Sequence, residues 1–341
     1  MPALSPDDRQ MLLDSAETLL ARAHDGARLR RLRDQGIAFD PAFWRLMAEA
    51  GWMGLRLPEA VGGSDLGVAA AVALAEVMGR HAVPDPYIAA CHLPAVLLGD
   101  SEAAAALATG EVGVGVMEGE VPLTGPSEVA LGAAVPGGET LLLADRGNGA
   151  EILFLRLAIT PELRLDGGAG GRVHVTARDL AGAEVLSAGP AALGLWRRAC
   201  DEAALVTAGY LTGLARQALA LSVEHLMQRK QFGQTLAQFQ VLQHRVVDLR
   251  IGIRMAEAAL GAALAAPADR MRLHAAKARA SAVASATTRQ AVQLHGALGF
   301  TDEAAIGLYL KLAMHHAQAF GSEAAHRTAH ARLSREARDA A

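Results

Sequence analysis

The chain has 341 residues, 52% of them hydrophobic and 20% charged, which is typical of an ordered globular protein with two or three domains. A formal net charge of −4 and an aromatic content of only 4% argue against a general nucleic-acid binder. Cys91 and Cys200 lie far apart without metal-type spacing, which favours a reducing compartment over a disulfide framework. The N-terminus lacks a signal-peptide pattern and no uncharged run has the length of a membrane span, so we expect a cytoplasmic protein.

The first segment of the chain, residues 1–110, is predicted to be an α-helical domain. Ser5 is expected to cap the first helix and Gly51 to end the second, because these residue types favour those positions. A loop rich in glycine and proline follows over residues 52–63. The predicted helices cover residues 6–30, 41–50, 68–81, 88–98 and 101–109.

The middle segment, residues 111–189, is predicted to be a small antiparallel β domain. Glycine and proline become frequent, and short alternating runs are separated by turns at residues 136–138 and 166–168. The expected strands are 112–116, 140–143, 152–155, 172–176 and 184–186. The glycines of residues 113–118 do not indicate a dinucleotide-binding fold, because no helix or βαβ unit follows them.

The last segment, residues 190–341, is predicted to be a four-helix bundle. Apolar residues recur at helical spacing over residues 198–228 and again from Leu242 to Pro267, and further helices are expected over 268–294, 303–320 and 323–338. The first two helices are joined by the short connection from Arg229 to Gln240. It carries a cation, aromatic rings, a glycine and several amides, which suit the phosphates and ring system of a ligand.

Local motifs along nearly the whole chain resemble those of the acyl-CoA dehydrogenases, in the same order. Residues 43–63 resemble the family's N-terminal stretch, and residues 76–79 with 84–86 resemble its next helix and exit. Arg229-x-Gln231-Phe232-Gly233 with Phe239-Gln240 resembles the main flavin signature, and Gln293 to Phe300 resembles the second. The resemblance implies a mainly α fold: an N-terminal helical domain, a small β domain and a C-terminal helical bundle that binds flavin.

The same resemblance implies FAD bound at a subunit interface of a dimer or a dimer of dimers. Taken singly, Arg229 is as typical of a solvated helix end and Phe232 of a core residue; together the two motifs favour flavin contacts. The implied contacts are Arg229 with the pyrophosphate, Gln231 and Phe232 with the adenosine side, Gln240 as a donor to the cofactor, Gln293 and Gly296 with the pyrophosphate of a neighbouring subunit, and Ser322 where the family usually has threonine beside FAD.

The catalytic base is the main departure from the family pattern. Family members remove an α-proton of the thioester with a glutamate at one of two positions, which are Phe320 and Ala203 in this chain. Neither side chain accepts a proton. Glu202 lies one residue from the second position, a turn of about 100° on a helix, and Glu323 lies near the first. Glu202 is the leading candidate and Glu323 the second.

Two hypotheses for function follow from the resemblance. In the first, the chain is an FAD-dependent acyl-CoA dehydrogenase that desaturates an acyl-CoA thioester between Cα and Cβ, as a homomer or as one subunit of a heteromer, in fatty acid or steroid side-chain catabolism. In the second, it is a non-catalytic subunit that holds FAD or completes such a heteromer. The implied partners are the acyl-CoA substrate, like or unlike subunits and an electron-transfer flavoprotein. No metal site is predicted, because His326 and His330 lack a third ligand.

Overall fold

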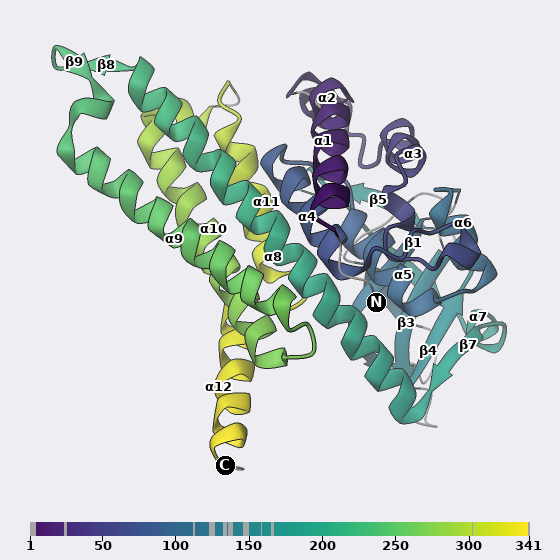
Figure 1. Cartoon of the computed structure of the whole chain (residues 1–341). Coiled ribbons are helices and arrows are strands. Elements are labelled where there is room, and N and C mark those ends of the chain that lie inside the picture. Colours follow the sequence, from purple (N-terminus) through teal and green to yellow (C-terminus); the bar gives the residue numbers. More distant parts are fainter. Residues whose placement is uncertain are drawn as a thin grey trace. The chain divides into compact units, whose positions relative to one another are not determined.

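The computed structural model describes residues 5–23, 26–111, 113–122, 127–131, 135, 139–145, 150–157, 159–164, 167–301 and 303–339. Its elements, drawn in Figure 1, fall into two units. The first comprises mainly Ala27–Ala71 and Pro84–Ala203, and the second mainly Arg9–Gly26, Val72–Val83 and Ala204–Ala341. Helices α4 (Gly67–Arg80) and α8 (Gly189–Gln228) each contribute residues to both. The division into three segments stays a prediction.

Short helices make up the N-terminal part of the first unit. Asp40 caps α3 by accepting hydrogen bonds from the amides of Ala42 and Phe43, and Gly51 adopts a left-handed φ of 77° just after the helix, as predicted. The loop over residues 52–63 contains two 3₁₀ turns. The elements are α2 (Gly26–Asp34), α3 (Pro41–Glu49), η1 (Trp52–Gly54), η2 (Glu59–Val61), the π-helical turn η3 (Ile88–His92), α5 (Leu93–Leu98) and α6 (Glu102–Ala108).

The first helix is shorter than the sequence predicted. Helix α1 (Pro6–Ala23) begins as expected, with the Ser5 hydroxyl accepting a hydrogen bond from the Asp8 amide at 3.1 Å. The predicted helix over 6–30 is instead two helices, α1 and α2, most of whose residues belong to different units. Gly26 is the first residue of α2, and glycine is a poor helix former in the interior of a helix, so a single helix through this position is disfavoured.

Two small sheets form the rest of the first unit. One has the strand order β1-β3-β4-β7 and the other β2-β6-β5. Leu153 and Leu155 of one sheet and Val173 and Val175 of the other belong to one hydrophobic cluster, so the two sheets share a core. The elements are β1 (Val114–Pro122), β2 (Ser127–Leu131), β3 (Glu139–Asp145), β4 (Ala150–Leu155), β5 (Thr160–Leu163), β6 (Ala169–Val175), α7 (Ala177–Ala181) and β7 (Glu184–Ala188).

The sequence did not predict this β part completely. The pairing of β1 with β3 is parallel, so the expectation of a wholly antiparallel domain was wrong. Strands β2 and β5 and helix α7 were missed. The α7 signal was present, since Thr176 and Asp179 form a capping box. The predicted turn at 136–138 and the first residue of the one at 166–168 lie outside the described residues.

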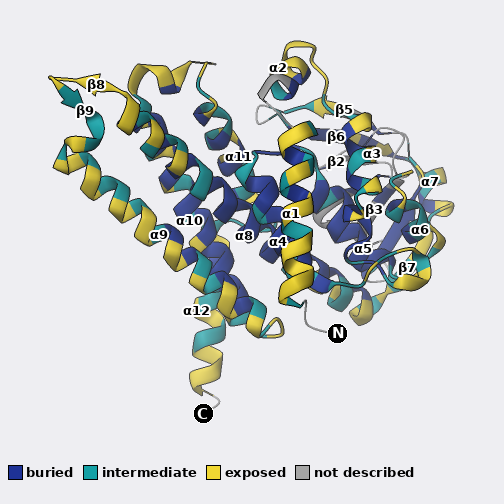
Figure 2. Ribbon diagram, turned by 45° about the horizontal axis from the view of Figure 1, so that its top comes forward, coloured by how far each residue is buried: buried dark blue, intermediate teal, exposed yellow. Residues whose placement is uncertain are grey.

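The helical bundle of the second unit agrees with the sequence. It contains residues 204–228 of α8, α9 (Gln240–Ala265), α10 (Arg270–His295), η5 (Gly296–Phe300), α11 (Ile306–Gln318) and α12 (Glu323–Asp339). Helix α10 is buried along most of its length and contacts α9, α11 and α12 (Figure 2). Its many alanines permit this close packing. Helix α8 begins nine residues before the predicted start at 198, with Pro190 in its first turn. None of the helices that the structure describes could cross a membrane.

Candidate flavin site and the position of the base

The predicted flavin signature forms a tight hairpin at the end of α8. Strands β8 (Lys230–Gln231) and β9 (Gln234–Thr235) pair through Lys230 with Thr235 and Gln231 with Gln234 (Figure 1). The turn holds Phe232 at a φ of 54° and Gly233 at 80°. A left-handed phenylalanine is unfavourable, so the hairpin fixes this ring at an energetic cost. The ring is 89% exposed and meets Phe239 edge-on at 6.2 Å.

The polar side chains of this segment that are predicted to contact the cofactor are accessible. Arg229 is exposed and forms no ion pair within the part of the chain that the structure describes. Its backbone is fixed, since its amide donates to the His225 carbonyl at 2.9 Å and its carbonyl accepts from Leu236. A guanidinium that forms no ion pair with a described residue and whose backbone is fixed by hydrogen bonds is well suited to bind a phosphate. Gln231 and Gln240, the first residue of α9, are also exposed.

The second signature ends α10 and begins η5. Gly296 has a φ of 62° and a ψ of −139°, which side chains rarely adopt, and the space where its Cβ would lie is open. A Cβ on Gly299 would lie 2.6 Å from the carbonyl oxygen of Val292, so that glycine allows η5 to fold back on α10. Gln293 and Gly296 are exposed. An accessible glycine beside an amide fits close approach by a phosphate.

The two signature segments meet at one end of the bundle. His225 of α8 and His295 of α10 stack with ring centroids 4.6 Å apart and an interplanar angle of 23°. His225 lies four residues before Arg229, and His295 directly precedes Gly296. The structure therefore brings the Arg229 and Gln293–Gly296 segments of one chain together. Sequence reasoning did not single out either histidine.

The loop that contains Phe320, one of the two positions where the family places its base, is fixed by hydrogen bonds from buried side chains of the bundle. Phe320 adopts a φ of 55°, and its carbonyl accepts a hydrogen bond from Nε2 of His326 at 2.9 Å. The fully buried Lys277 donates from Nζ to the Ser281 hydroxyl at 3.0 Å and to the Gly321 carbonyl at 3.2 Å. Lys277 was also missed, although a lysine on the alanine-rich buried face of a helix is an unusual signal.

Ser322 and Glu323 follow this loop and begin α12. The Ser322 hydroxyl accepts a hydrogen bond from the Ala325 amide at 3.2 Å, so this side chain caps the helix. Glu323 lies in the first turn and pairs with Arg327 at 2.7 Å. A capping hydroxyl and an acidic side chain in the first turn both stabilise the N-terminus of a helix. Whether Ser322 contacts FAD therefore stays a prediction.

Glu202, the leading candidate for the base, lies in a polar cluster of the first unit. Arg56 donates from Nε and from a terminal nitrogen to its two oxygens, at 2.7 and 3.0 Å. The Arg56 and Glu202 side chains are 19% and 16% exposed. Both carboxylate oxygens are thus engaged in a bidentate ion pair. A proton on Glu202 would remove the negative charge that the Arg56 guanidinium pairs with, so this ion pair opposes the uptake of a proton by Glu202.

His92 completes the cluster. Its Nε2 lies 3.8 Å from Oε2 of Glu202, and its two ring nitrogens are buried without a hydrogen bond to any described residue. Burial lowers the pKa of His92 to about 4, an effect that the nearby Glu202 opposes, so the ring is neutral at pH 7. The π-helical turn η3 ends at this residue, and such turns occur frequently at functional sites.

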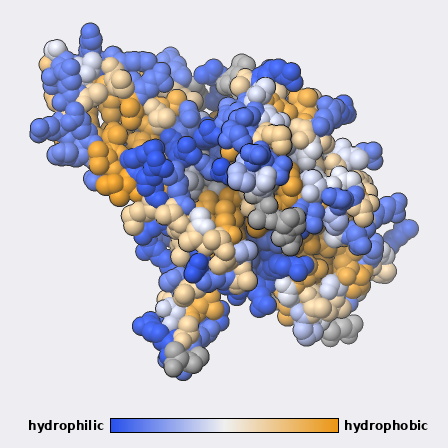
Figure 3. Space-filling model, viewed as in Figure 1, coloured by the Kyte–Doolittle hydropathy of each residue, from blue (hydrophilic) through white to orange (hydrophobic). Residues whose placement is uncertain are grey.

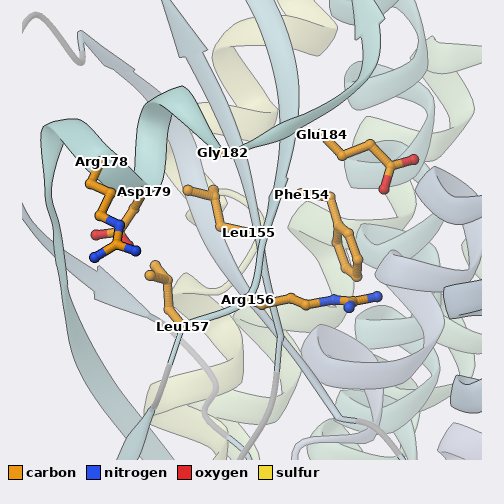
Figure 4. A pocket seen from close by; sticks show the side chains of 8 residues that line it. All are labelled: Phe154, Leu155, Arg156, Leu157, Arg178, Asp179, Gly182 and Glu184. Carbon is orange, nitrogen blue, oxygen red and sulfur yellow. The ribbon is translucent and has the colours of Figure 1, made fainter.

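A pocket of about 460 Å³ lies in the β part of the first unit, away from all of the predicted site residues in sequence. Figure 4 shows Arg178 and Asp179 of α7 on one side of Leu155 and Leu157, with Arg156 and Glu184 on the other. Asp179 is already engaged, because hydrogen bonds from Thr176 lower the pKa of its carboxyl. The pocket contains none of the candidate flavin or base residues.

Comparison with known proteins agrees with these features. Residues 6–99 match the model of the acyl-CoA dehydrogenase N-terminal domain, and residues 193–334 match that of the C-terminal domain. The acyl-CoA dehydrogenase IpdE2 of Mycolicibacterium smegmatis is 30% identical over 92% of this chain and 95% of its own length. The chain belongs to the acyl-CoA dehydrogenase family.

Other relatives confirm the fold. IpdE2 of Mycobacterium tuberculosis is 30% identical over 92% of this chain and 93% of its own length. Two solved structures share the fold: a Tcur3481–Tcur3483 steroid ACAD variant, with a TM-score of 0.84, 22% identity and coverage of 98% and 99%, and the ChsE4–ChsE5 complex of Mycobacterium tuberculosis, with a TM-score of 0.83, 19% identity and coverage of 98% of each chain. The predicted mainly α architecture is therefore confirmed.

Proposed function

We propose that this chain is an FAD-binding subunit of an acyl-CoA dehydrogenase that desaturates an acyl-CoA thioester between Cα and Cβ. Family membership supports an oxidoreductase. The observation that carries the flavin proposal is the convergence of Arg229, the His225–His295 stack and Gly296 at one accessible end of the bundle. Two of the relatives by fold are described as complexes of two different chains, which supports a heteromer.

The residues proposed to hold FAD fit a dinucleotide. Arg229 supplies a fixed positive charge for the diphosphate and Gln240 supplies an amide, while Gly296 offers an open backbone position and Gln293 an amide to the pyrophosphate of a neighbouring subunit. Phe232 presents an exposed ring to the adenosine side. When bound, FAD supplies the acceptor for the hydride that leaves the β-carbon.

An unlike subunit is proposed to supply the base. Ala203 and Phe320 occupy the two family positions, and both oxygens of Glu202 are held by Arg56. These contacts favour a heteromer over a self-sufficient enzyme. They also support the second candidate function, a non-catalytic subunit that holds FAD or completes the assembly. That Glu202 acts as the base stays a prediction of the first hypothesis, in which the chain is itself a catalytic acyl-CoA dehydrogenase.

Anaerobic spectroscopy separates these functions. The purified chain is expected to show a flavin spectrum that acyl-CoA thioesters do not bleach until the unlike subunit is added. Bleaching by the chain alone would show that it contains a base, and Glu202→Gln would then identify Glu202 if it abolished the bleaching. A protein that binds no FAD, alone or with a partner, would contradict the flavin proposal.

A further inference from the structure

A fully buried histidine faces the ion pair of Arg56 with Glu202. The side chain of His92 is 0% exposed, and neither of its ring nitrogens forms a hydrogen bond with a described residue. All three residues belong to the first unit, where His92 ends η3 and Glu202 lies on α8. A polar group without a partner is costly in a protein interior, so a buried imidazole of this kind indicates that the site binds a polar group.

The turn that carries His92 is fixed against η1. The Cys91 thiol, within η3, donates to the Met53 carbonyl at 3.5 Å. The Tyr87 hydroxyl, one residue before η3, donates to the Trp52 carbonyl at 3.3 Å. Both acceptors belong to η1. The backbone therefore holds the His92 ring beside Glu202.

The neutral state of the ring determines what it can bind. Burial lowers the pKa of His92 to about 4, so at pH 7 one ring nitrogen carries a hydrogen and the other is a bare acceptor. Nε2 lies 3.8 Å from Oε2 of Glu202, which is too long for a direct hydrogen bond. The negative charge of the carboxylate favours the hydrogen at Nε2. An N–H donor and a carboxylate acceptor therefore lie next to each other.

A hydroxyl group matches this donor and this acceptor. Its oxygen can accept from Nε2 of His92, and its hydrogen can donate to Oε2 of Glu202. An oxygen about 2.8 Å from each atom can bridge their separation. Oε2 accepts from Nε of Arg56 at 2.7 Å and has a second lone pair for the hydroxyl. A carbonyl could not donate to the carboxylate, and an ammonium would be repelled by the Arg56 guanidinium.

We propose that His92 and Glu202 form a binding site for a hydroxyl group, with Arg56 holding the carboxylate in place. The hydroxyl belongs either to a water molecule or to an alcohol on the acyl group of the thioester. The alcohol rests on the proposed function, because it depends on Glu202 directly preceding Ala203, one of the two positions where the family places its base. With that source, the site selects hydroxylated acyl-CoA thioesters.

The first measurement is a crystal structure of the full-length chain without thioester, at a resolution that shows ordered water. We expect an oxygen within hydrogen-bond distance of both Nε2 of His92 and Oε2 of Glu202. His92→Phe removes both ring nitrogens and should lose this oxygen. Tyr87→Phe is the matched control, because it also removes a buried polar group of the same segment, and it should keep the oxygen. A direct hydrogen bond from His92 to another side chain in place of this oxygen, or no oxygen there in the unmodified chain, would overturn the site.

The second measurement identifies the source of the hydroxyl. Calorimetry compares the Kd of butyryl-CoA with that of its hydroxylated derivatives. An alcohol bound at this site should lower the Kd about two- to tenfold, and the gain should disappear in His92→Phe but not in Tyr87→Phe. Equal affinities, with the oxygen present in the crystal, assign the site to water. A chain that binds no thioester would contradict the proposed function, whereas the crystal structure would still decide the hydroxyl site.

Discussion

At the scale of single residues, the neutral His92 ring makes stability depend on pH. Its pKa is lowered by burial from 6.5 to about 4. Below pH 6.5 the unfolded chain binds a proton at this ring, whereas the folded chain does so only near pH 4. The stability associated with the neutral His92 ring is thus fully present above pH 6.5 and is lost as the pH falls to 4. The free energy of unfolding changes by about 3 kcal/mol over this range.

The measurement is the urea unfolding free energy at pH 7 and pH 4.5 for the wild type and for His92→Leu. Carboxylates also titrate in this range, so the effect of His92 is obtained by comparing the loss of unfolding free energy in the wild type with that in His92→Leu. The wild type should lose more stability than His92→Leu, by about 2–3 kcal/mol. Equal losses in the two proteins would show that this ring is not held neutral.

The pairing of Arg56 with Glu202 predicts that Glu202→Gln weakens the fold. Removing the carboxylate leaves a mostly buried guanidinium without its counter-charge, which should cost about 1–3 kcal/mol. Arg56→Met combined with Glu202→Gln removes both charges and should recover part of this loss. Thermal unfolding of the single and double variants measures the coupling. Additive losses would indicate that the two side chains do not interact.

The cluster around Glu202 also marks the limit of reasoning from the sequence at this scale. Glu202 was selected because it is one residue from a family position. Arg56, its partner, lies 146 positions away. Only the folded backbone brings these two together, and nothing in the local pattern around Arg56 indicates an ion pair. The stacked His225 and His295 were missed for the same reason.

At the scale of helices, α4 and α8 cross within the second unit with glycines at the contact. A Cβ on Gly79 would lie 2.0 Å from the Tyr210 carbonyl oxygen, and one on Gly213 would lie 2.0 Å from that of Glu76. Both obstacles are backbone atoms, which cannot turn aside. The Tyr210 hydroxyl also donates to the Val83 carbonyl at 2.6 Å. The crossing therefore depends on these two glycines.

Gly213→Ala is expected to destabilise the protein by several kcal/mol, on the order of 3 or more, because the helices must separate. The matched control is Gly194→Ala in the same helix, where a Cβ meets nothing within 4 Å. That change should stabilise by about 0.5–1 kcal/mol through helix propensity. Denaturant unfolding of both variants tests the contrast. Similar effects at the two positions would contradict a close crossing.

Helices were largely predictable and strand pairing was not. Periodic apolar residues located α9, α10, α11 and α12 within a few residues, since that signal is local. The parallel pairing of β1 with β3 joins Val114 to Glu139 and depends on the fold between them. The missed strands β2 and β5 are short; in the sequence β2 follows Gly125-Pro126 and precedes Gly132, and β5 contains Pro161. Their alternation of apolar and polar residues was too short to distinguish a strand from a loop.

At the scale of the whole molecule, the order of motifs along the chain predicted the fold. The exposed apolar side chains of α9 indicate in addition that the chain associates with another subunit. Helix α9 carries apolar side chains at spacings of about one turn, with Val247 53%, Ile251 53% and Met255 48% exposed. Figure 3 shows apolar atoms along this side of the bundle. A stripe of this kind on a rigid helix typically contacts another chain. It therefore supports the proposed subunit assembly.

Ile251→Lys should disrupt that assembly, because it places a charge at the centre of the stripe where a partner would have to desolvate it. Light scattering during size-exclusion chromatography measures the mass, and the wild type should run at a multiple of the 35.4 kDa chain or as a complex with its unlike subunit. The variant should run near the mass of one chain. Leu193→Lys is the matched control, since Leu193 is an exposed apolar residue, 46% accessible, outside α9. Retention of the assembled mass by Ile251→Lys would show that α9 does not form the subunit contact, and dissociation by both variants would show that the effect is not specific to α9.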